Sequence, residues 1–352
     1  MLPDSSVRPR VAAYDGLRAV AAIAVVAIHA WPALVRGGHL GVDVFFVLSG
    51  WLITTLLVNE LSATGRVALG HFYWRRAKRL LPPLVIAVVL AIVVAAAAWP
   101  ASLVDTERQG VAALLYLGNW AVLDRWAHSG LLSHTWTLGI EEQFYAVWPL
   151  VILVVLRYGG RRLACVIAVS LAVLGVAHEV FIGGAWVAES RGSGLLVGSA
   201  LALATDGWWL RWPRAWRVIT PIAAACLVTL LVAGSEVFWP LVVLASAVVV
   251  PSLGGHRTSR VSQALAWSPL VWLGRRSYAL YLLNLPLTAL LLPSFGYGPV
   301  LLITAGTLSV FGAAASWRYI EAPLAAWGRG RNTASVSMRS VRPAPPVDFA
   351  AR

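Results

Sequence analysis

The chain has 352 residues, of which 59% are hydrophobic, 12% are charged and 18 are tryptophan, and its formal net charge is +13. A soluble domain of this length cannot bury so much apolar surface, so the composition excludes an ordinary soluble protein and indicates a membrane protein. The positive charge does not indicate a nucleic-acid partner. The arginines fall between the apolar runs, where they orient a membrane protein and contact anionic headgroups of the lipid bilayer.

Apolar runs of about 20 residues follow one another along most of the chain, and each is long enough to cross a bilayer. We predict an all-α integral membrane protein, a bundle of about ten transmembrane helices with cytoplasmic N- and C-termini. The predicted spans are residues 18–35, 41–60, 80–100, 136–157, 163–184, 193–207, 217–234, 237–255, 270–293 and 298–317. This order places every arginine cluster on the cytoplasmic side, as the positive-inside rule requires. The apolar run at 110–119 is too short to cross and is predicted to be a re-entrant or surface helix in an outer loop.

The domain organisation follows from the same pattern. We predict a cytoplasmic N-terminal segment at 1–17, a membrane domain at 18–327 and a basic cytoplasmic tail at 328–352. The tail is rich in Arg, Ser and Pro and poor in large apolar residues, which predicts disorder. Both cysteines, Cys165 and Cys226, lie in apolar runs, so neither a disulfide framework nor a metal site is expected.

The first predicted span carries two ionisable residues, Arg18 and His29, eleven positions apart. That spacing is almost three helical turns, which puts both side chains on one face, about 16 Å apart along the axis. The arginine is then expected at the water interface and the histidine near mid-membrane, where an ionisable group usually faces a cavity. The pattern favours a base that acts on the reactive end of an anchored anionic ligand. The alternative is a buried histidine that only hydrogen-bonds a neighbouring helix.

Polar residues interrupt the second span at Asp43, Ser49 and Gly50. Asp43 either caps this helix at its outer end or orients a histidine from a neighbouring helix. Gly50 permits close packing of helices, which is the structural alternative to a functional Ser-Gly pair.

The third span opens on a cluster of arginines, Arg75, Arg76 and Arg79. With spacings of three and four residues, these positive charges crowd one helix surface. Positive-inside anchoring explains such a cluster, and binding of phosphate groups explains it equally well.

The fourth span contains adjacent carboxylates, Glu141 and Glu142, about one and a half turns inside its outer boundary. Adjacent intramembrane glutamates each need a partner or a proton, so a purely structural role is uncommon. Glu141 shares a helix face with Tyr145, whereas Glu142 points about 100° away. Because His29 and Glu141 are both predicted in the outer half of the membrane, we expect Glu141 or Asp43 to support the histidine as a base.

Taken in order, these segments resemble the acyltransferase-3 family of bacterial integral-membrane acyltransferases. The resemblance runs from about Tyr14 to Leu324 and rests on Arg18-x10-His29, Gly-Val-Asp43-Val-Phe-Phe-Val-Leu-Ser-Gly, Arg76-x-x-Arg79, Trp136-Thr-Leu-x-x-Glu141-x-Gln-Phe-Tyr145, Arg275-x-Ser-Tyr-x-x-Tyr-Leu-Leu and Glu321-x-Pro. It implies transfer of an acyl group, often acetyl, from cytoplasmic acyl-CoA to a hydroxyl of a sugar or other acceptor. It also implies an essential role for Arg18, His29, Arg76 and Arg79. The family often has a histidine where this chain has Asn284, which keeps only hydrogen bonding at that position.

The mechanism expected from this resemblance uses arginines to bind the phosphates of the donor at the cytoplasmic mouth of the bundle. The candidates are Arg76 and Arg79, followed by Arg18, Arg75 and Arg275. His29 then removes the proton from the acceptor hydroxyl, which attacks the thioester directly, or else His29 forms an acyl intermediate.

Further candidate site residues surround this chemistry. Tyr145, Ser49 or Asn284 is expected to donate a hydrogen bond to the developing oxyanion, and Glu142 is a further candidate without an assigned role. Acetyl-CoA is the expected donor, and the mechanism needs no metal.

The alternative function is a proton-coupled transporter or flippase that uses His29 and Glu141 as a proton relay. Transporters of that kind often show repeated halves and paired broken helices, and neither pattern is evident in the sequence. We therefore predict a multi-pass O-acyltransferase, expected to transfer acetyl, in the bacterial cytoplasmic membrane. The expected acceptor is a cell-surface polysaccharide, a lipid-linked sugar or a small molecule, recognised by outer loops such as 101–134.

Overall fold

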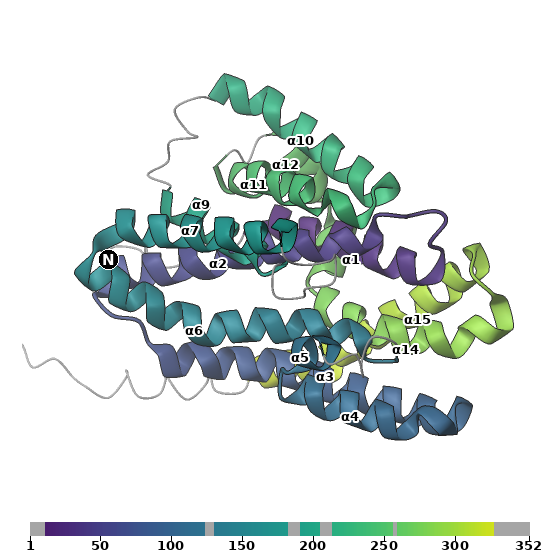
Figure 1. Ribbon diagram of the computed structural model, residues 1–352. Helices are drawn as coiled ribbons and strands as arrows, with labels where there is room; N and C mark the ends of the chain where they lie inside the picture. The colour runs from purple at the N-terminus through teal and green to yellow at the C-terminus, as the bar shows by residue number, and fades with distance from the viewer. Residues whose placement is uncertain (1–10, 124–129, 182–190, 205–212, 256–258, 327–352) are drawn as a thin grey trace, which may run out of the picture.

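The computed structural model describes residues 11–123, 130–181, 191–204, 213–255 and 259–326. These residues form a bundle of helices with no strand among them (Figure 1). Eight of the helices are long and apolar enough to cross a membrane, which confirms the all-α membrane class. The predicted tail at 328–352 and most of the predicted segment 1–17 lie outside the described residues.

Each predicted span overlaps one α-helix, except that the span predicted at 270–293 covers two α-helices separated at residues 275–276. The long helices are α1 (Ala12–Ala30), α2 (Gly41–Thr64), α3 (Leu69–Ala98), α6 (Trp136–Tyr158), α7 (Gly160–Phe181), α10 (Pro213–Ala233), α14 (Ser277–Phe295) and α15 (Pro299–Ser316). Two apolar helices are shorter, α9 (Ser193–Ala204) and α11 (Trp239–Gly255). Short elements connect these helices, namely η1 (Gly38–Leu40), η2 (Pro100–Ser102), α4 (Leu103–Leu114), α5 (Gly118–Leu123), η3 (Ser133–Thr135), η5 (Glu236–Phe238), α12 (Arg260–Leu265), α13 (Ser268–Gly274), η6 (Trp317–Glu321) and α16 (Ala322–Ala326). The predicted spans at 193–207 and 237–255 thus correspond to helices that fall short of the other eight in length.

The first helix begins and ends earlier than the predicted span at 18–35. Its end is explained by Pro32, because the residue before a proline disfavours helical backbone, and Trp31 has φ −145° and ψ 72°. His29 therefore lies in the last turn of α1 rather than in the middle of a span, which corrects the prediction of its place in the helix.

Helix α1 lies in the centre of the bundle and packs against α2, α13, α14 and α15. Its buried face consists largely of alanine, which allows these neighbours to approach closely. Helices α7, α10 and α15 instead keep large apolar side chains exposed, such as Val173, Ile222 and Phe311. Exposed apolar surface of this kind is expected of helices that face lipid.

Glycine brings α2 and α9 into contact. A Cβ atom added at Gly50 would lie 1.9 Å from the carbonyl oxygen of Leu195, and one added at Gly198 would lie 2.1 Å from that of Val47. Only glycine fits at such a distance, so the prediction that Gly50 serves close helix packing is confirmed.

The run predicted to be re-entrant or superficial forms α4 and α5, which pack on α3 and α6 (Figure 1). The chain turns between them at Tyr116, whose φ of 56° is unusual for a residue with a side chain. Gln143 of α6 fixes this turn, because its Nε2 donates to the carbonyl oxygen of Tyr116 at 2.8 Å and to Asn119 Oδ1 at 3.0 Å. Neither helix is long enough to cross a bilayer, as the sequence predicted.

Candidate active site

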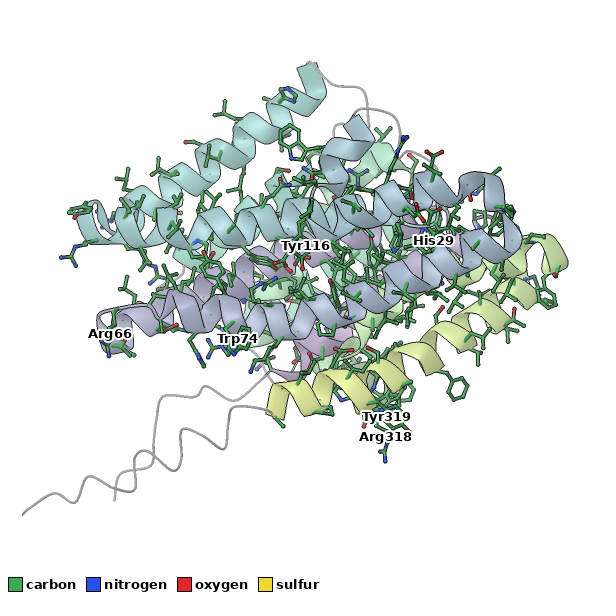
Figure 2. The ribbon with its side chains drawn as sticks, turned by 90° about the horizontal axis from the view of Figure 1, so that it is seen from below. His29, Arg66, Trp74, Tyr116, Arg318 and Tyr319 are labelled. Carbon is green, nitrogen blue, oxygen red and sulfur yellow. The ribbon has the colours of Figure 1, made fainter. Side chains whose placement is uncertain are left out.

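His29 forms its side-chain hydrogen bond with Asn284 of α14. The distance from His29 Nδ1 to Asn284 Oδ1 is 2.8 Å, and Asn284 Nδ2 donates to Thr288 Oγ1 at 3.3 Å. An amide oxygen only accepts, so Nδ1 carries the proton and Nε2 keeps its lone pair. The ring is partly exposed within the bundle, which leaves Nε2 able to accept a proton (Figure 2).

Arg18 and His29 contact the same neighbouring helix. Arg18 Nε donates to Ser277 Oγ at 3.3 Å, at the start of α14, and His29 binds Asn284 seven residues further along that helix. The prediction that both side chains share one face of α1 is therefore confirmed. Although His29 lies near the end of α1, this bond places it level with the middle of α14.

The two carboxylates expected to support His29 bind other groups. Glu141 Oε1 accepts hydrogen bonds from Ser49 Oγ and from Tyr145 Oη, each at 2.5 Å. Asp43 is fully buried and forms an ion pair with Arg191 at 2.8 Å. The expected pairing of His29 with Glu141 or Asp43 is corrected, because Asn284 takes the position beside the ring.

A second polar group lies around Glu142. Arg76 Nη2 donates to Glu142 Oε1 at 2.6 Å, and the guanidinium carbon lies 3.4 Å from the centre of the Tyr145 ring. Arg76 Nε is buried without a hydrogen-bond partner. Tyr116 interacts electrostatically with both charges of this pair, so the turn between α4 and α5 lies near it (Figure 2).

The predicted phosphate-binding arginines do not form one cluster. Arg76 is partly buried in its ion pair instead of lying at an open mouth. Arg275 Nε lies 3.5 Å from Asp15 Oδ2. Arg18 is hydrogen-bonded to Ser277, and its guanidinium carbon lies 5.6 Å from the centre of the Phe45 ring. Arg75, Arg79 and Arg275 have exposed side chains, and Arg79 interacts electrostatically with Glu142 and Glu321.

His134 is a site residue that the sequence analysis did not single out. It is 6% exposed, no side chain bonds to either ring nitrogen, and the ring interacts with the backbone of Leu282. Its ring lies 5.1 Å from that of Tyr281, whose hydroxyl donates to the His134 carbonyl oxygen at 2.7 Å and lies 2.9 Å from Thr137 Oγ1. The ring is also near enough to His29 for their charges to interact.

The sequence did contain a signal for His134. A histidine two residues before Trp136, at the start of an apolar run, is unusual. Arg191 was likewise visible as a charge at the start of a helix, yet its pairing with Asp43 depends on the packing of α2 against α9.

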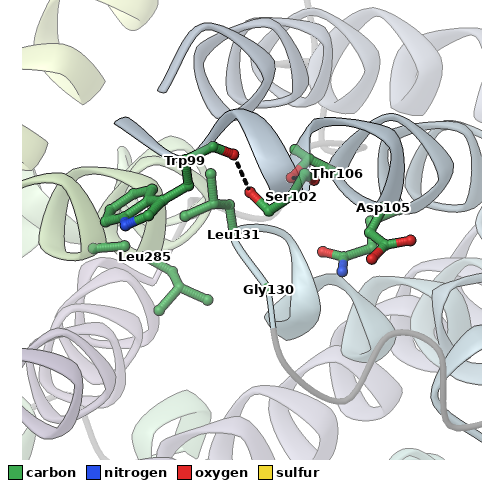
Figure 3. Close-up of a pocket in the computed structure, with 9 residues that line it drawn as sticks. Trp99, Ser102, Asp105, Thr106, Gly130, Leu131 and Leu285 are labelled. Atoms are coloured by element: carbon green, nitrogen blue, oxygen red, sulfur yellow. Dashed lines mark hydrogen bonds between the residues drawn. The ribbon is translucent and has the colours of Figure 1, made fainter. Parts of the chain in front are cut away.

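A cavity of about 450 Å³ opens beside α14 at the end of α3 (Figure 3). Its lining combines an aromatic ring, hydroxyls, a carboxylate and an amide, from Trp99, Ser102, Asp105, Thr106, Gln109, Gly130, Leu131, Leu285 and Ala289. Most of these residues come from the predicted outer loop, and Leu285 follows Asn284 directly. The cavity therefore adjoins α14, the helix whose Asn284 is hydrogen-bonded to His29.

The sequence matches the family model described as an acyltransferase domain over residues 11–318. It is 30% identical to the peptidoglycan O-acetyltransferase OatA of Listeria monocytogenes, over 90% of this chain and 56% of that protein. It is also 30% identical to the O-acetyltransferase OatA of Staphylococcus aureus, over 88% of this chain and 56% of that protein. The putative peptidoglycan O-acetyltransferase YrhL of Bacillus subtilis is 30% identical over 89% and 55% of the two chains.

The chain spans about half the length of the curated relatives it matches. No solved structure matches it. The family match covers nearly all of the described helices, including those that carry His29, Glu141 and Asn284. The chain therefore belongs to the acyltransferase-3 family of bacterial integral-membrane acyltransferases.

Proposed function

We propose that this chain is an O-acetyltransferase of the bacterial cytoplasmic membrane that transfers an acetyl group to a sugar hydroxyl. The observation that carries the proposal is the orientation of His29, whose Nδ1 is bound to Asn284 and whose Nε2 keeps its lone pair. A neutral, oriented imidazole is the group needed to take a proton from a hydroxyl. The names of the relatives support acetyl as the group and a cell-wall sugar as the acceptor.

In this proposal an acyl-CoA, with acetyl-CoA as the expected donor, presents its thioester to the acceptor beside His29. Nε2 takes the hydroxyl proton while the hydroxyl oxygen forms a bond to the acyl carbon. The carbon–sulfur bond then breaks, and His29 returns the proton to the leaving thiolate. Ester and free thiol are the products, and the imidazole ends neutral as it began.

We assign the stabilisation of the oxyanion to His134 rather than to Ser49 or Tyr145. Both hydroxyls already donate to Glu141, so their protons are not directed at a substrate. His134 is buried near His29, and no side chain bonds to either ring nitrogen, so the ring has a donor to offer to a ligand.

The polar group around Glu142 is assigned to the acyl donor. Arg76 keeps a buried Nε without a partner, which suits an amide or thioester oxygen of the donor arm. Arg79 and Arg75 lie on the same helix with exposed side chains and are assigned to the donor phosphates. The cavity of Figure 3 is assigned to the acceptor, because an aromatic ring beside hydroxyls, an amide and a carboxylate suits a carbohydrate.

The test measures thiol release from acetyl-CoA by the purified chain in liposomes, with and without soluble peptidoglycan fragments as acceptor. We compare wild type with His29→Asn and use His178→Asn as the control, because His178 is an exposed histidine in the last turn of another spanning helix. The proposal predicts acceptor-dependent release that only His29→Asn abolishes. A folded wild type that neither binds acetyl-CoA nor releases thiol with any sugar acceptor contradicts it, and proton-coupled transport then becomes the function to test.

A further inference from the structure

A second cavity, of about 710 Å³, lies where α13 and α15 end. It is lined by three aromatic residues, two arginines and two alanines, namely Trp272, Trp317, Tyr319, Arg276, Arg318, Ala314 and Ala322. None of these lining residues is acidic. A cavity with two guanidinium groups and no carboxylate in its lining is suited to an anion.

Arg276 is held in place by two tryptophans that line this cavity. Its Nη1 donates to the Trp272 carbonyl oxygen at 2.7 Å, and its guanidinium carbon lies 4.0 Å from the Trp272 ring and 5.6 Å from the Trp317 ring. Its Nε is buried without a hydrogen-bond partner. Burial lowers the pKa of Arg276, and the nearby charge of Arg275 adds to this effect. The group is thus a fixed cation whose Nε donor has no partner within the protein.

The carboxylate of Glu321 interacts electrostatically with Arg276 but makes no hydrogen bond with Arg276 Nε. Glu321 Oε1 accepts a hydrogen bond from Ser316 Oγ at 2.9 Å. Within the described residues Glu321 makes no ion pair with Arg276, so the cavity keeps its positive charge.

The backbone supports the same interpretation. Residues Trp317–Glu321 form a π-helical turn at the end of α15, and this turn carries Trp317, Arg318 and Tyr319 to the cavity. Such turns are rare in proteins, and those that occur are often found at functional sites. The side chains of Arg318 and Tyr319 project outward from the bundle in Figure 2, and Tyr319 is 72% exposed.

We propose that this cavity binds the phosphate of an anionic phospholipid, with Arg276 and Arg318 on the phosphate and the aromatic rings beside the glycerol and acyl chains. Arginine combined with tryptophan and tyrosine at the ends of spanning helices is the pattern of a lipid headgroup region. The predicted topology places these helix ends on the cytoplasmic side, where arginine-lined pockets between helices bind anionic headgroups. The proposal does not depend on acyl transfer.

The phosphates of a nucleotide share this chemistry, so the experiment has two arms. The delipidated full chain in phosphatidylcholine nanodiscs is titrated with phosphatidylglycerol, and bound lipid is counted by native mass spectrometry. In the second arm adenosine 3′,5′-bisphosphate is titrated by calorimetry. The variants are Arg276→Gln and Arg318→Gln. Arg157→Gln is the control, because Arg157 lines neither described cavity. Like Arg276 it lies near an aromatic ring, with its guanidinium carbon 6.0 Å from the centre of the exposed Tyr158 ring.

We expect phosphatidylglycerol binding to weaken about fivefold to tenfold in each variant and to remain unchanged in the control. If both variants lose nucleotide binding and keep phosphatidylglycerol binding, the cavity is a phosphate site, but its ligand is a nucleotide and not a lipid. If both variants bind phosphatidylglycerol and nucleotide as wild type does, the proposal is overturned. Arg318 is exposed, so Arg318→Gln tests the site even if replacement of Arg276 impairs folding.

Discussion

Asn284 accepts a hydrogen bond from His29 Nδ1 at 2.8 Å, across 255 residues of sequence. Carboxylates often hold a catalytic histidine in this way, but here a neutral amide does so. It fixes the tautomer of the imidazole without adding a negative charge beside it. The orientation of His29 thus depends on a single contact between α1 and α14.

Replacement of Asn284 tests this contact. Asn284→Leu removes the acceptor for Nδ1–H, so we expect acetyl transfer to fall by about tenfold to a hundredfold, part of what a positioned base contributes. Asn284→Asp restores an acceptor and should retain more activity than Asn284→Leu. The measurement is kcat in the thiol-release assay. Equal activity of wild type and Asn284→Leu contradicts the role of the amide.

His134 gives a second prediction. Because no side chain bonds to its ring, His134→Asn should lower the thermal unfolding midpoint in detergent only slightly. If His134 stabilises the oxyanion, kcat falls by about a hundredfold with little change in donor KM. A fall in unfolding midpoint with unchanged kcat indicates that His134 serves packing alone.

The pair of Arg76 and Glu142 is expected to contribute to stability. Their side chains are 24% and 17% exposed, so Arg76→Leu leaves a poorly solvated carboxylate and should lower the free energy of unfolding by about 1–3 kcal/mol. The double variant Arg76→Leu/Glu142→Leu should recover much of this loss. The measurement is denaturant unfolding in micelles, with Arg108→Leu as the control.

The control pair, Arg108 and Asp105, is 66% and 62% exposed and 3.7 Å apart, so its loss should change stability by less than about 1 kcal/mol. An equal effect of Arg76→Leu and Arg108→Leu indicates that the inner pair is solvated like a surface pair.

The contact at Gly50 predicts a large effect of a small side chain. In Gly50→Ala the new Cβ meets the Leu195 carbonyl oxygen, so α2 and α9 must separate, at a cost of about 1–3 kcal/mol. Gly70→Ala is the matched control, since nothing lies within 4 Å of a Cβ atom added there. We expect a lower unfolding midpoint for the first variant only. A common midpoint for both variants excludes tight packing at Gly50.

The sequence predicted the helices well because apolar runs near the length of a bilayer have few alternative structures. The error in the first span has a physical cause. The apolar run continues through Ala33 to Val35, but Pro32 ends the helix before it. Composition alone therefore located the span, and one proline determined where it ends.

The polar residues inside the bundle could be predicted by type, but their partners could not. Ionisable groups inside apolar helices are recognisable from sequence because burial of each is costly. Which of them meet depends on packing between distant helices, as with Glu142 and Arg76, which lie 66 residues apart. Sequence spacing predicted that Arg18 and His29 share a face, because both lie on one helix. It gave no information on the partner helix.

The two contacts between α1 and α14 have a consequence for movement within the bundle. Arg18 is joined to Ser277 and His29 to Asn284, so α1 is bonded to α14 at two levels. Neither helix can slide along the other or turn away from it without breaking one of these bonds. In the proposed function the imidazole therefore keeps its orientation only while the two helices stay together, and a movement that parted them would leave the base without its tautomer fixed.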